Sequence, residues 1–326
     1  MTAKQDATLR RTVLEKMYLA RAFEDCISAL AAEQGRLPGM QILATGQEAA
    51  AAAALALGKD DVMVTNHRSH VHLLARGADP KTLLAEIMGK ESGVNHGKSG
   101  TLHLIVPEVN ALMTSTVVGA SPLLALGAAF AQQYKETNAL TMVFFGDGAA
   151  AEGSVHEAMN MAGVWKLPLL FVCENNCWAG AQSFKEHCSA GNIASRASSY
   201  GMPGELVNGN DPDDVLNTAL ELASMCRDGR GPALMELTTY RMHGHGEYDK
   251  QHYVDPAEIE FWAERDPIVM FSSRLEQEGV LGEGQAEAMR REAADKVAEA
   301  LKFADESPYP APEAALEHVW ASPEHI

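Results

Sequence analysis

Two apolar segments separated by a helical one constrain the fold of this chain more than any other feature. Residues 141–145 and 168–173 are apolar and short enough to be buried strands. Residues 152–165, which lie between them, are expected to form a helix. A strand, a helix and a strand within about 30 residues make a βαβ unit, whose two strands are parallel. The sequence therefore predicts an α/β fold, a parallel sheet flanked by helices.

The same order recurs later in the chain. A short strand within "ELVNG", a helix from Pro212 and a strand from Ala233 repeat the pattern. Two helices are expected before the first unit. Six consecutive alanines at 49–54 suit a tightly packed helix, because small side chains let neighbouring elements approach closely. A second buried helix is expected from Ser121.

Both ends of the chain are expected to be helical extensions of one domain that spans residues 1–326. An amphipathic docking helix near the N-terminus is predicted by apolar residues at helical spacing, namely Leu9, Val13, Met17 and Ala20. We expect a helical arm at 1–45, and a C-terminal helix and tail at 276–326. The charged helix at 281–305 either faces solvent or packs on a partner.

Charge and cysteine content disfavour several function classes. The chain has 44 acidic and 26 basic residues, a formal charge of −18 that disfavours a nucleic-acid groove. Its five cysteines lack the spacing of a zinc site or a disulfide framework, so free thiols in a reducing compartment are expected. The N-terminal residues contain no apolar block long enough for a signal peptide or a membrane span. We therefore expect a cytoplasmic protein that binds neither nucleic acid nor membrane.

Polar residues follow three of the predicted strands and should meet at one edge of the sheet. Asp147 follows the first strand, Asn176 the second, and an Arg with two His follows the strand from Ala233 within "YRMHGH". Ligands of such sheets bind beyond the carboxyl ends of the strands. Carboxylate and amide oxygens suit Mg²⁺ or Ca²⁺, and Mg²⁺ commonly takes further ligands from water and a phosphate group. The simpler alternative is that Asp147 caps a helix and the Asn pair makes a turn.

A longer set of motifs resembles a known family. The Gly-Asp-Gly turn at 146–148 and the Asn pair at 175–176 have the spacing of the thiamine-diphosphate motif. The segments "ATGQEAAAAAA", "NHRSHVHLLARG", "VVGASPLLALGAAFA" and "TTYRMHGHGEYD" resemble, in this order, α subunits of thiamine-diphosphate-dependent 2-oxo acid and acetoin dehydrogenases. The resemblance spans nearly the whole chain and implies the thiamine-diphosphate-binding fold.

The resemblance implies a role for each matching residue. Mg²⁺ would be bound by Asp147, Asn176 and the backbone carbonyl of Trp178, and the cofactor's diphosphate by the amides of Gly148 and Ala149. The other cofactor-binding residues would be His67, Arg68, Thr116, Val118, Arg241 and His245. Catalytic roles would belong to His70 and His245.

The resemblance also implies an activity and partners. Such an enzyme cleaves the C–C bond next to the carbonyl of acetoin or of a 2-oxo acid such as pyruvate. It then passes the acyl group to a lipoyl-bearing acyltransferase or another acceptor. It is an α2β2 heterotetramer whose β subunit supplies the glutamate that activates the cofactor's pyrimidine ring. Glu48 is not that residue, so we expect the isolated α chain to bind cofactor poorly and to catalyse nothing.

Three departures from the family pattern involve four positions. Ile42 stands where many relatives have a histidine, and it cannot donate a hydrogen bond to a substrate carboxylate, which favours acetoin or an apolar carbonyl compound over pyruvate. His67 replaces a tyrosine of pyruvate-specific relatives. Gly246 and Tyr253 stand where regulated relatives are phosphorylated, so control by a dedicated kinase is not expected.

Other functions fit the sequence less well. A single-chain homodimeric thiamine lyase or ligase would need its own pyrimidine-activating glutamate, and a non-catalytic homologue would not need an intact site. Zinc binding by the His-rich segments lacks supporting Cys or acidic residues. Lys98 and Ser99 in "HGKSG" resemble the end of a P-loop, but Ser92 stands where that motif requires glycine.

Overall fold

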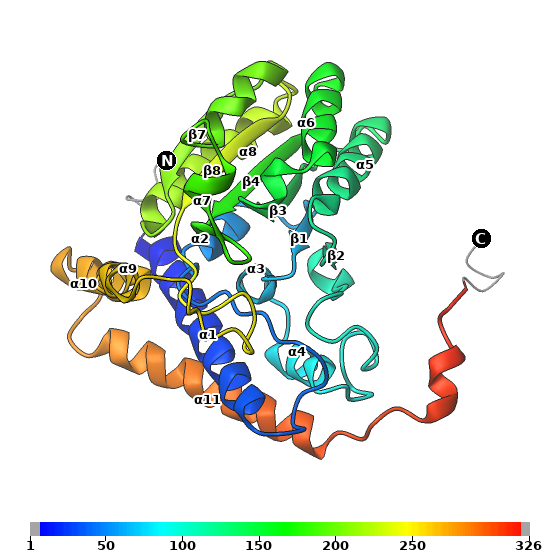
Figure 1. The fold of residues 1–326 in the computed structure, drawn as a ribbon, viewed down its shortest axis with the longest axis vertical. Helices are drawn as coiled ribbons and strands as arrows, with labels where there is room; N and C mark the ends of the chain where they lie inside the picture. Colours follow the sequence, from blue (N-terminus) through cyan, green and yellow to red (C-terminus); the bar gives the residue numbers. More distant parts are fainter. Residues whose placement is uncertain (1–6, 321–326) are drawn as a thin grey trace.

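The computed structural model describes residues 7–320, and a parallel sheet lies at its centre (Figure 1). Six of the strands in these residues form this sheet in the order β2-β1-β3-β4-β8-β7, and every pair within it is parallel. The predicted α/β class is confirmed. The strands are β1 Val62–Asn66, β2 Ala111–Ser115, β3 Thr141–Gly146, β4 Leu169–Asn175, β7 Gly204–Asn208 and β8 Ala233–Thr238.

Helices cover both faces of the sheet because alternate strand residues point to opposite sides. In β3, Met142 and Phe144 belong to the apolar cluster that includes α1, α2 and α8. Val143 and Phe145 belong to a second cluster, with α5 and α6. All four side chains are at most 1% exposed, which explains why the strand is uniformly apolar.

The helices expected from the sequence are present. The N-terminal helix is α1 Ala7–Ala32, the alanine run forms α2 Ala50–Leu55, and the helix expected from Ser121 is α5 Ala120–Tyr134. The helices of the two βαβ units are α6 Gly153–Trp165 and α8 Pro212–Arg227. The remaining helices are α3 His70–Arg76, α4 Pro80–Ile87, α7 Phe184–His187, α9 Pro256–Ala263, α10 Pro267–Gln277 and α11 Gln285–Glu306, with short 3-10 turns at η2 Pro107–Val109, η3 Ala149–Ala151, η4 Ala194–Tyr200 and η5 Pro312–Leu316. None of the described helices is long and apolar enough to cross a membrane.

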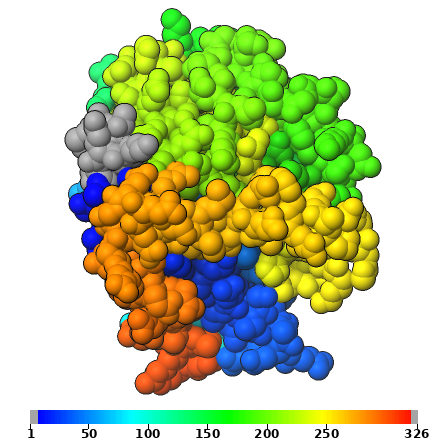
Figure 2. All heavy atoms as spheres, turned by 90° about the vertical axis from the view of Figure 1, so that its left-hand side faces the viewer, coloured from blue at the N-terminus to red at the C-terminus, as the bar shows by residue number. Residues whose placement is uncertain are grey.

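The N-terminal helix belongs to the core, and the C-terminal helices pack on it. Val13 and Met17 of α1 are fully buried. The charged helix α11 contacts α1 and α4 through a face that includes Val297, while its other face is exposed. Figure 2 shows α9 and α10 (yellow to orange) crossing this side between the green residues above and the blue N-terminal residues below.

The C-terminal tail leaves the body of the molecule as an extended strap (Figure 1). Beyond residue 310, the described part of the tail contacts the rest of the molecule at the loop 96–98. There Lys98 Nζ donates to the Glu317 carbonyl at 3.0 Å, and the His96 ring stacks on that of His318. Trp320 is 88% exposed. Residues 1–6 and 321–326, the outermost parts of the predicted arm and tail, lie outside the described residues.

Candidate active site

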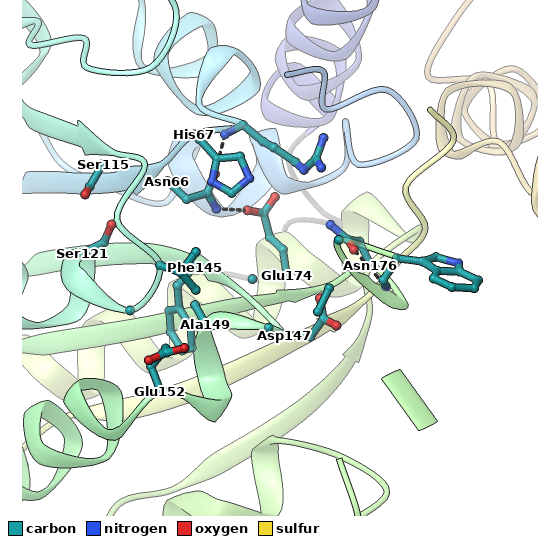
Figure 3. A pocket seen from close by; sticks show the side chains of 18 of the residues that line it. Asn66, His67, Ser115, Ser121, Phe145, Asp147, Ala149, Glu152, Glu174 and Asn176 are labelled. Atoms are coloured by element: carbon teal, nitrogen blue, oxygen red, sulfur yellow. Dashed lines mark hydrogen bonds between the residues drawn. The ribbon is translucent and has the colours of Figure 1, made fainter. Parts of the chain in front are cut away.

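A cavity of about 280 Å³ lies at the carboxyl edge of the sheet (Figure 3). Its walls come from residues that directly follow β1, β3 and β4, together with the segment 115–119 and the loop that carries His245. The walls converge because parallel strands deliver their carboxyl ends to the same edge. Most of the residues predicted from the sequence are at this edge.

Asp147 and Asn176 line the cavity from neighbouring strands. Asp147 follows β3 and is 2% exposed, and Asn176 follows β4 and is 5% exposed. The Asn176 side chain donates to Gln47 Oε1 at 3.0 Å and accepts from the Trp178 amide at 3.2 Å. Trp178 also lines the cavity. Two oxygen-bearing side chains with an adjacent backbone turn are the donor set that Mg²⁺ prefers, so these residues fit that ion.

Two buried arginines form a cationic wall beside these oxygens. Arg68 lines the cavity, and its guanidinium donates to the carbonyls of Leu43 and His245. Burial and the charge of Arg241 lower the pKa of Arg68 to about 10. Arg241 is fully buried just behind the lining; it donates to Tyr253 Oη at 2.6 Å, whereas its Nε and Nη1 have no partner among the described residues.

Such a cluster is costly without an anion. A buried N–H group without a partner costs about 1–3 kcal/mol, and a second buried cation adds repulsion. An anionic group in the cavity would offset both costs. The cluster thus fits the diphosphate that the sequence motif predicts.

Two histidines beside these arginines are neutral near pH 7. His67 and His245 both line the cavity, with ring centroids 5.8 Å apart. Burial, with the charges of Arg68, His245 and Arg241, lowers the pKa of His67 to about 3. Burial and Arg68 also lower the pKa of His245. A neutral imidazole can accept a proton as well as donate one.

The turn after Asp147 brings backbone close to the cavity. Gly148 and Ala149 line it at the start of η3. A Cβ on Gly148 would lie 2.8 Å from Ala179 Cβ, so only glycine lets β5 (Trp178–Ala179) pack this closely. Val118 also lines the cavity and is 53% exposed.

Besides Arg241, two predicted residues do not line the cavity. His70 is fully buried, with Nδ1 at 3.2 Å from Glu24 Oε1 and Nε2 at 2.7 Å from Thr101 Oγ1. Thr116 Oγ1 lies 3.4 Å from His103 Nε2 and is two residues from Val118. Their predicted roles stay predictions.

Sequence reasoning missed Glu174, which lines the cavity at the end of β4. Its carboxylate accepts from Asn66 Nδ2 at 2.9 Å and lies 3.2 Å from His72 Nε2. Asn66 Oδ1 in turn accepts from the Arg68 amide at 2.7 Å, so Glu174 steadies the segment that carries Arg68. Its place directly before the Asn pair was a signal that could have identified it.

Two residues and one motif that the sequence analysis singled out also lie away from the cavity lining. Glu48 is fully buried and paired with Arg21 at 2.5 Å. Ile42 is 1% exposed and has no place in the lining. In "HGKSG", the Gly97 and Ser99 amides donate to the Glu86 carboxylate at 2.8 and 2.7 Å, so they are not available to a phosphate.

Comparison with known proteins decides the family. Residues 15–313 match the family described as dehydrogenase E1 component. The chain belongs to the dehydrogenase E1 component family. The chain is 38% identical to the α subunit of acetoin:2,6-dichlorophenolindophenol oxidoreductase of Bacillus subtilis, over 94% of this chain and 92% of that protein.

Two further relatives also align with most of this chain and over most of their own length. The α subunit of the corresponding acetoin enzyme of Cupriavidus necator is 34% identical, over 95% of this chain and 94% of that protein. The pyruvate dehydrogenase E1 α subunit of Rhizobium meliloti is 35% identical, over 90% and 85%. All three are named as α subunits, so the predicted family and the α-subunit type are confirmed.

Membership of the E1 family implies thiamine diphosphate as cofactor. The paired oxygen donors, the cationic wall and the close backbone turn fit the diphosphate end of that cofactor. The α-subunit relatives also imply a β-subunit partner in a multi-subunit enzyme. The homodimeric lyase weighed as an alternative is not supported by these relatives.

Proposed function

We propose that this chain is the α subunit of an α2β2 dehydrogenase that cleaves the C–C bond beside a carbonyl group. The substrate would be acetoin or a 2-oxo acid such as pyruvate, the compounds in the names of the relatives. The observation that carries the proposal is one cavity in which Asp147 and Asn176 face a wall with Arg68.

The residues would divide the work as follows. Asp147, Asn176 and the Trp178 carbonyl would hold Mg²⁺. The amides of Gly148 and Ala149 would bind the diphosphate, with Arg68, Arg241, His67 and His245 as side-chain donors. Thr116 and Val118 would hold the pyrimidine ring. When bound, thiamine diphosphate supplies a nucleophilic carbon and an electron sink for C–C cleavage.

Proton transfer at this site would fall to His245. Its imidazole lines the cavity, and its lowered pKa keeps the ring neutral, so that one ring nitrogen is free to take a proton and return it. The catalytic role predicted for His70 stays a prediction, because Glu24 and Thr101 enclose its imidazole.

A β subunit as direct partner is supported by an apolar surface beside the cavity. Val117 and Val118 are 65% and 53% exposed, and Leu123, Leu124 and Phe130 of α5 are exposed next to them in the chain. Surfaces of this kind mark protein–protein contacts. We propose that the acyl group passes to a lipoyl-bearing acyltransferase or to another acceptor, and that the protein is cytoplasmic.

The experiment that tests this is native mass spectrometry of the protein purified from its own cells without added cofactor. We expect an α2β2 mass that retains thiamine diphosphate and Mg²⁺. Dye reduction by this complex with acetoin and with pyruvate then identifies the substrate. A homodimer of this chain that takes up thiamine diphosphate without another subunit would contradict the proposal.

A further inference from the structure

The segment after β4 forms a closed loop whose two ends meet at the proposed metal site. It begins with Asn176, turns through the hairpin β5–β6 (β6 Gln182–Ser183) and ends with His187 of α7. The Phe184 amide donates to the Cys177 carbonyl at 2.8 Å and closes the loop. Ser183 and Glu186 form a capping box that fixes α7.

His187 reaches Asp147 from the far end of this loop. Its Nε2 lies 3.0 Å from Asp147 Oδ2, and the two side chains are 9% and 2% exposed. The Phe184 ring packs edge-on against the imidazole, with centroids 5.5 Å apart. Among the described residues, no other side chain hydrogen-bonds the Asp147 carboxylate, and Oδ1 has no partner.

We propose that His187 is a positioning residue for the metal: it holds Asp147 Oδ2 and leaves Oδ1 as the carboxylate oxygen that would bind Mg²⁺. The inference rests on the proposed function and deepens it. Metal-binding carboxylates generally take a hydrogen bond from an outer partner, and losing that partner costs roughly 10- to 100-fold in metal affinity. One loop would thereby supply Asn176 and Trp178 to the metal and orient the third ligand.

The sequence could not have indicated this role. His187 lies 40 positions from Asp147 in the chain and outside every quoted family motif. Only the hairpin and α7 bring its imidazole to the carboxylate.

The test compares four variants of this chain, each purified with its β subunit and freed of cofactor. Mg²⁺ is titrated at saturating thiamine diphosphate, and its dissociation constant is measured by calorimetry. His187→Asn has an amide too short to reach Asp147, whereas the His187→Gln amide has nearly the reach of Nε2. His156→Gln is the matched control, because His156 pairs with Tyr200 Oη at 2.5 Å and does not line the cavity. Asp147→Asn shows the effect of losing the ligand charge.

We expect His187→Asn to weaken Mg²⁺ binding roughly 10- to 100-fold. His187→Gln and His156→Gln should stay close to wild type, and Asp147→Asn should be the weakest binder. Unchanged or tighter binding by His187→Asn would overturn the inference, and so would equal losses in the Asn and Gln variants, which indicate packing alone. Those results leave the proposed function standing if wild type binds Mg²⁺ and cofactor. A wild-type complex that binds neither overturns both.

Discussion

At the scale of single residues, the site contains charged groups whose burial lowers the stability of the fold as long as no ligand is bound. Arg241 is fully buried, and its Nε and Nη1 have no hydrogen-bond partner among the residues that the structure describes; Arg68 lies beside it in the same cationic wall. Folding tolerates such a cluster only at some expense in stability. This loss of stability is what we expect of a site that is preformed for an anion.

Arg241→Met should therefore have opposite effects on stability and on binding. The cofactor-free complex should gain about 1–3 kcal/mol in free energy of unfolding, because a buried charge with unpaired donors is removed. Thiamine diphosphate should bind more weakly. Thermal unfolding with and without the cofactor measures both effects, and a variant less stable than wild type without cofactor would contradict the argument.

The pH dependence of the cofactor-free complex follows from His67. The pKa of this ring is about 3 in the folded chain, against an ordinary value of 6.5. Between these values the unfolded chain binds a proton that the folded chain does not. The contribution of His67 to the free energy of unfolding is therefore fully present above pH 6.5 and is lost as the pH falls toward 3.

His67→Gln should lose less stability than wild type when the pH is lowered from about 7 to about 5. Melting temperatures at the two pH values provide the measurement. The exposed residue His252 offers the control variant His252→Gln, which should follow wild type. Parallel curves for His67→Gln and wild type would show that His67 does not cause the dependence.

At the scale of elements, the N-termini of several helices are marked by a local sequence signal that the apolar pattern does not contain. Four helices begin with an aspartate followed by proline, and the aspartate accepts from backbone amides of the first turn. These aspartates are Asp79, Asp211, Asp255 and Asp266. Aspartate is a favoured N-cap and proline a favoured first helical residue. The helices α9 and α10, which we did not predict, carry this signal.

The loop at 95–99 shows an element organised by one distant side chain. Glu86 of α4 is fully buried and accepts from the amides of Asn95, Gly97 and Ser99 at 2.7–2.8 Å. A carboxylate therefore replaces the phosphate that the "HGKSG" motif suggests. This contact needs the folded helix α4, so no local sequence pattern could reveal it.

Glu86→Ala should loosen this loop without dissolving the sheet. Leaving the amides without their acceptor should cost about 2–4 kcal/mol in free energy of unfolding. Trypsin should then cut after Lys98 sooner than in wild type, which limited proteolysis followed by mass spectrometry can measure. Glu91, whose side chain is exposed, supplies the control Glu91→Ala. Equal cleavage of both variants would contradict the assigned role.

At the scale of the whole molecule, buried ion pairs join the N-terminal helix to the rest. Arg10 of α1 is 1% exposed and pairs with Asp213 of α8 at 2.7 Å and with Glu278 after α10 at 2.6 Å. Removing one partner of a buried pair typically costs about 3–5 kcal/mol, because the charge left behind, here that of Asp213, stays buried.

Arg10→Ala should lower the free energy of unfolding by about 3–5 kcal/mol and the melting temperature with it. Arg290→Ala is the control, since Arg290 is exposed and pairs with Glu287 of its own helix. Urea unfolding of the two variants beside wild type measures the difference. A loss no larger than that of the control would show that α1 is held by apolar packing alone.

The sequence by itself determined the α/β class, the strands and helices of the two βαβ units, and the residues at the ends of β3 and β4. These follow from local patterns, because periodicity and strand ends are properties of neighbouring residues. It did not determine that His70 faces Glu24 and Thr101. Nor did it reveal that His187 reaches Asp147 or that Glu174 lines the cavity. Those contacts join residues far apart in the chain, and only the packing of helices and loops around the sheet decides which of them meet.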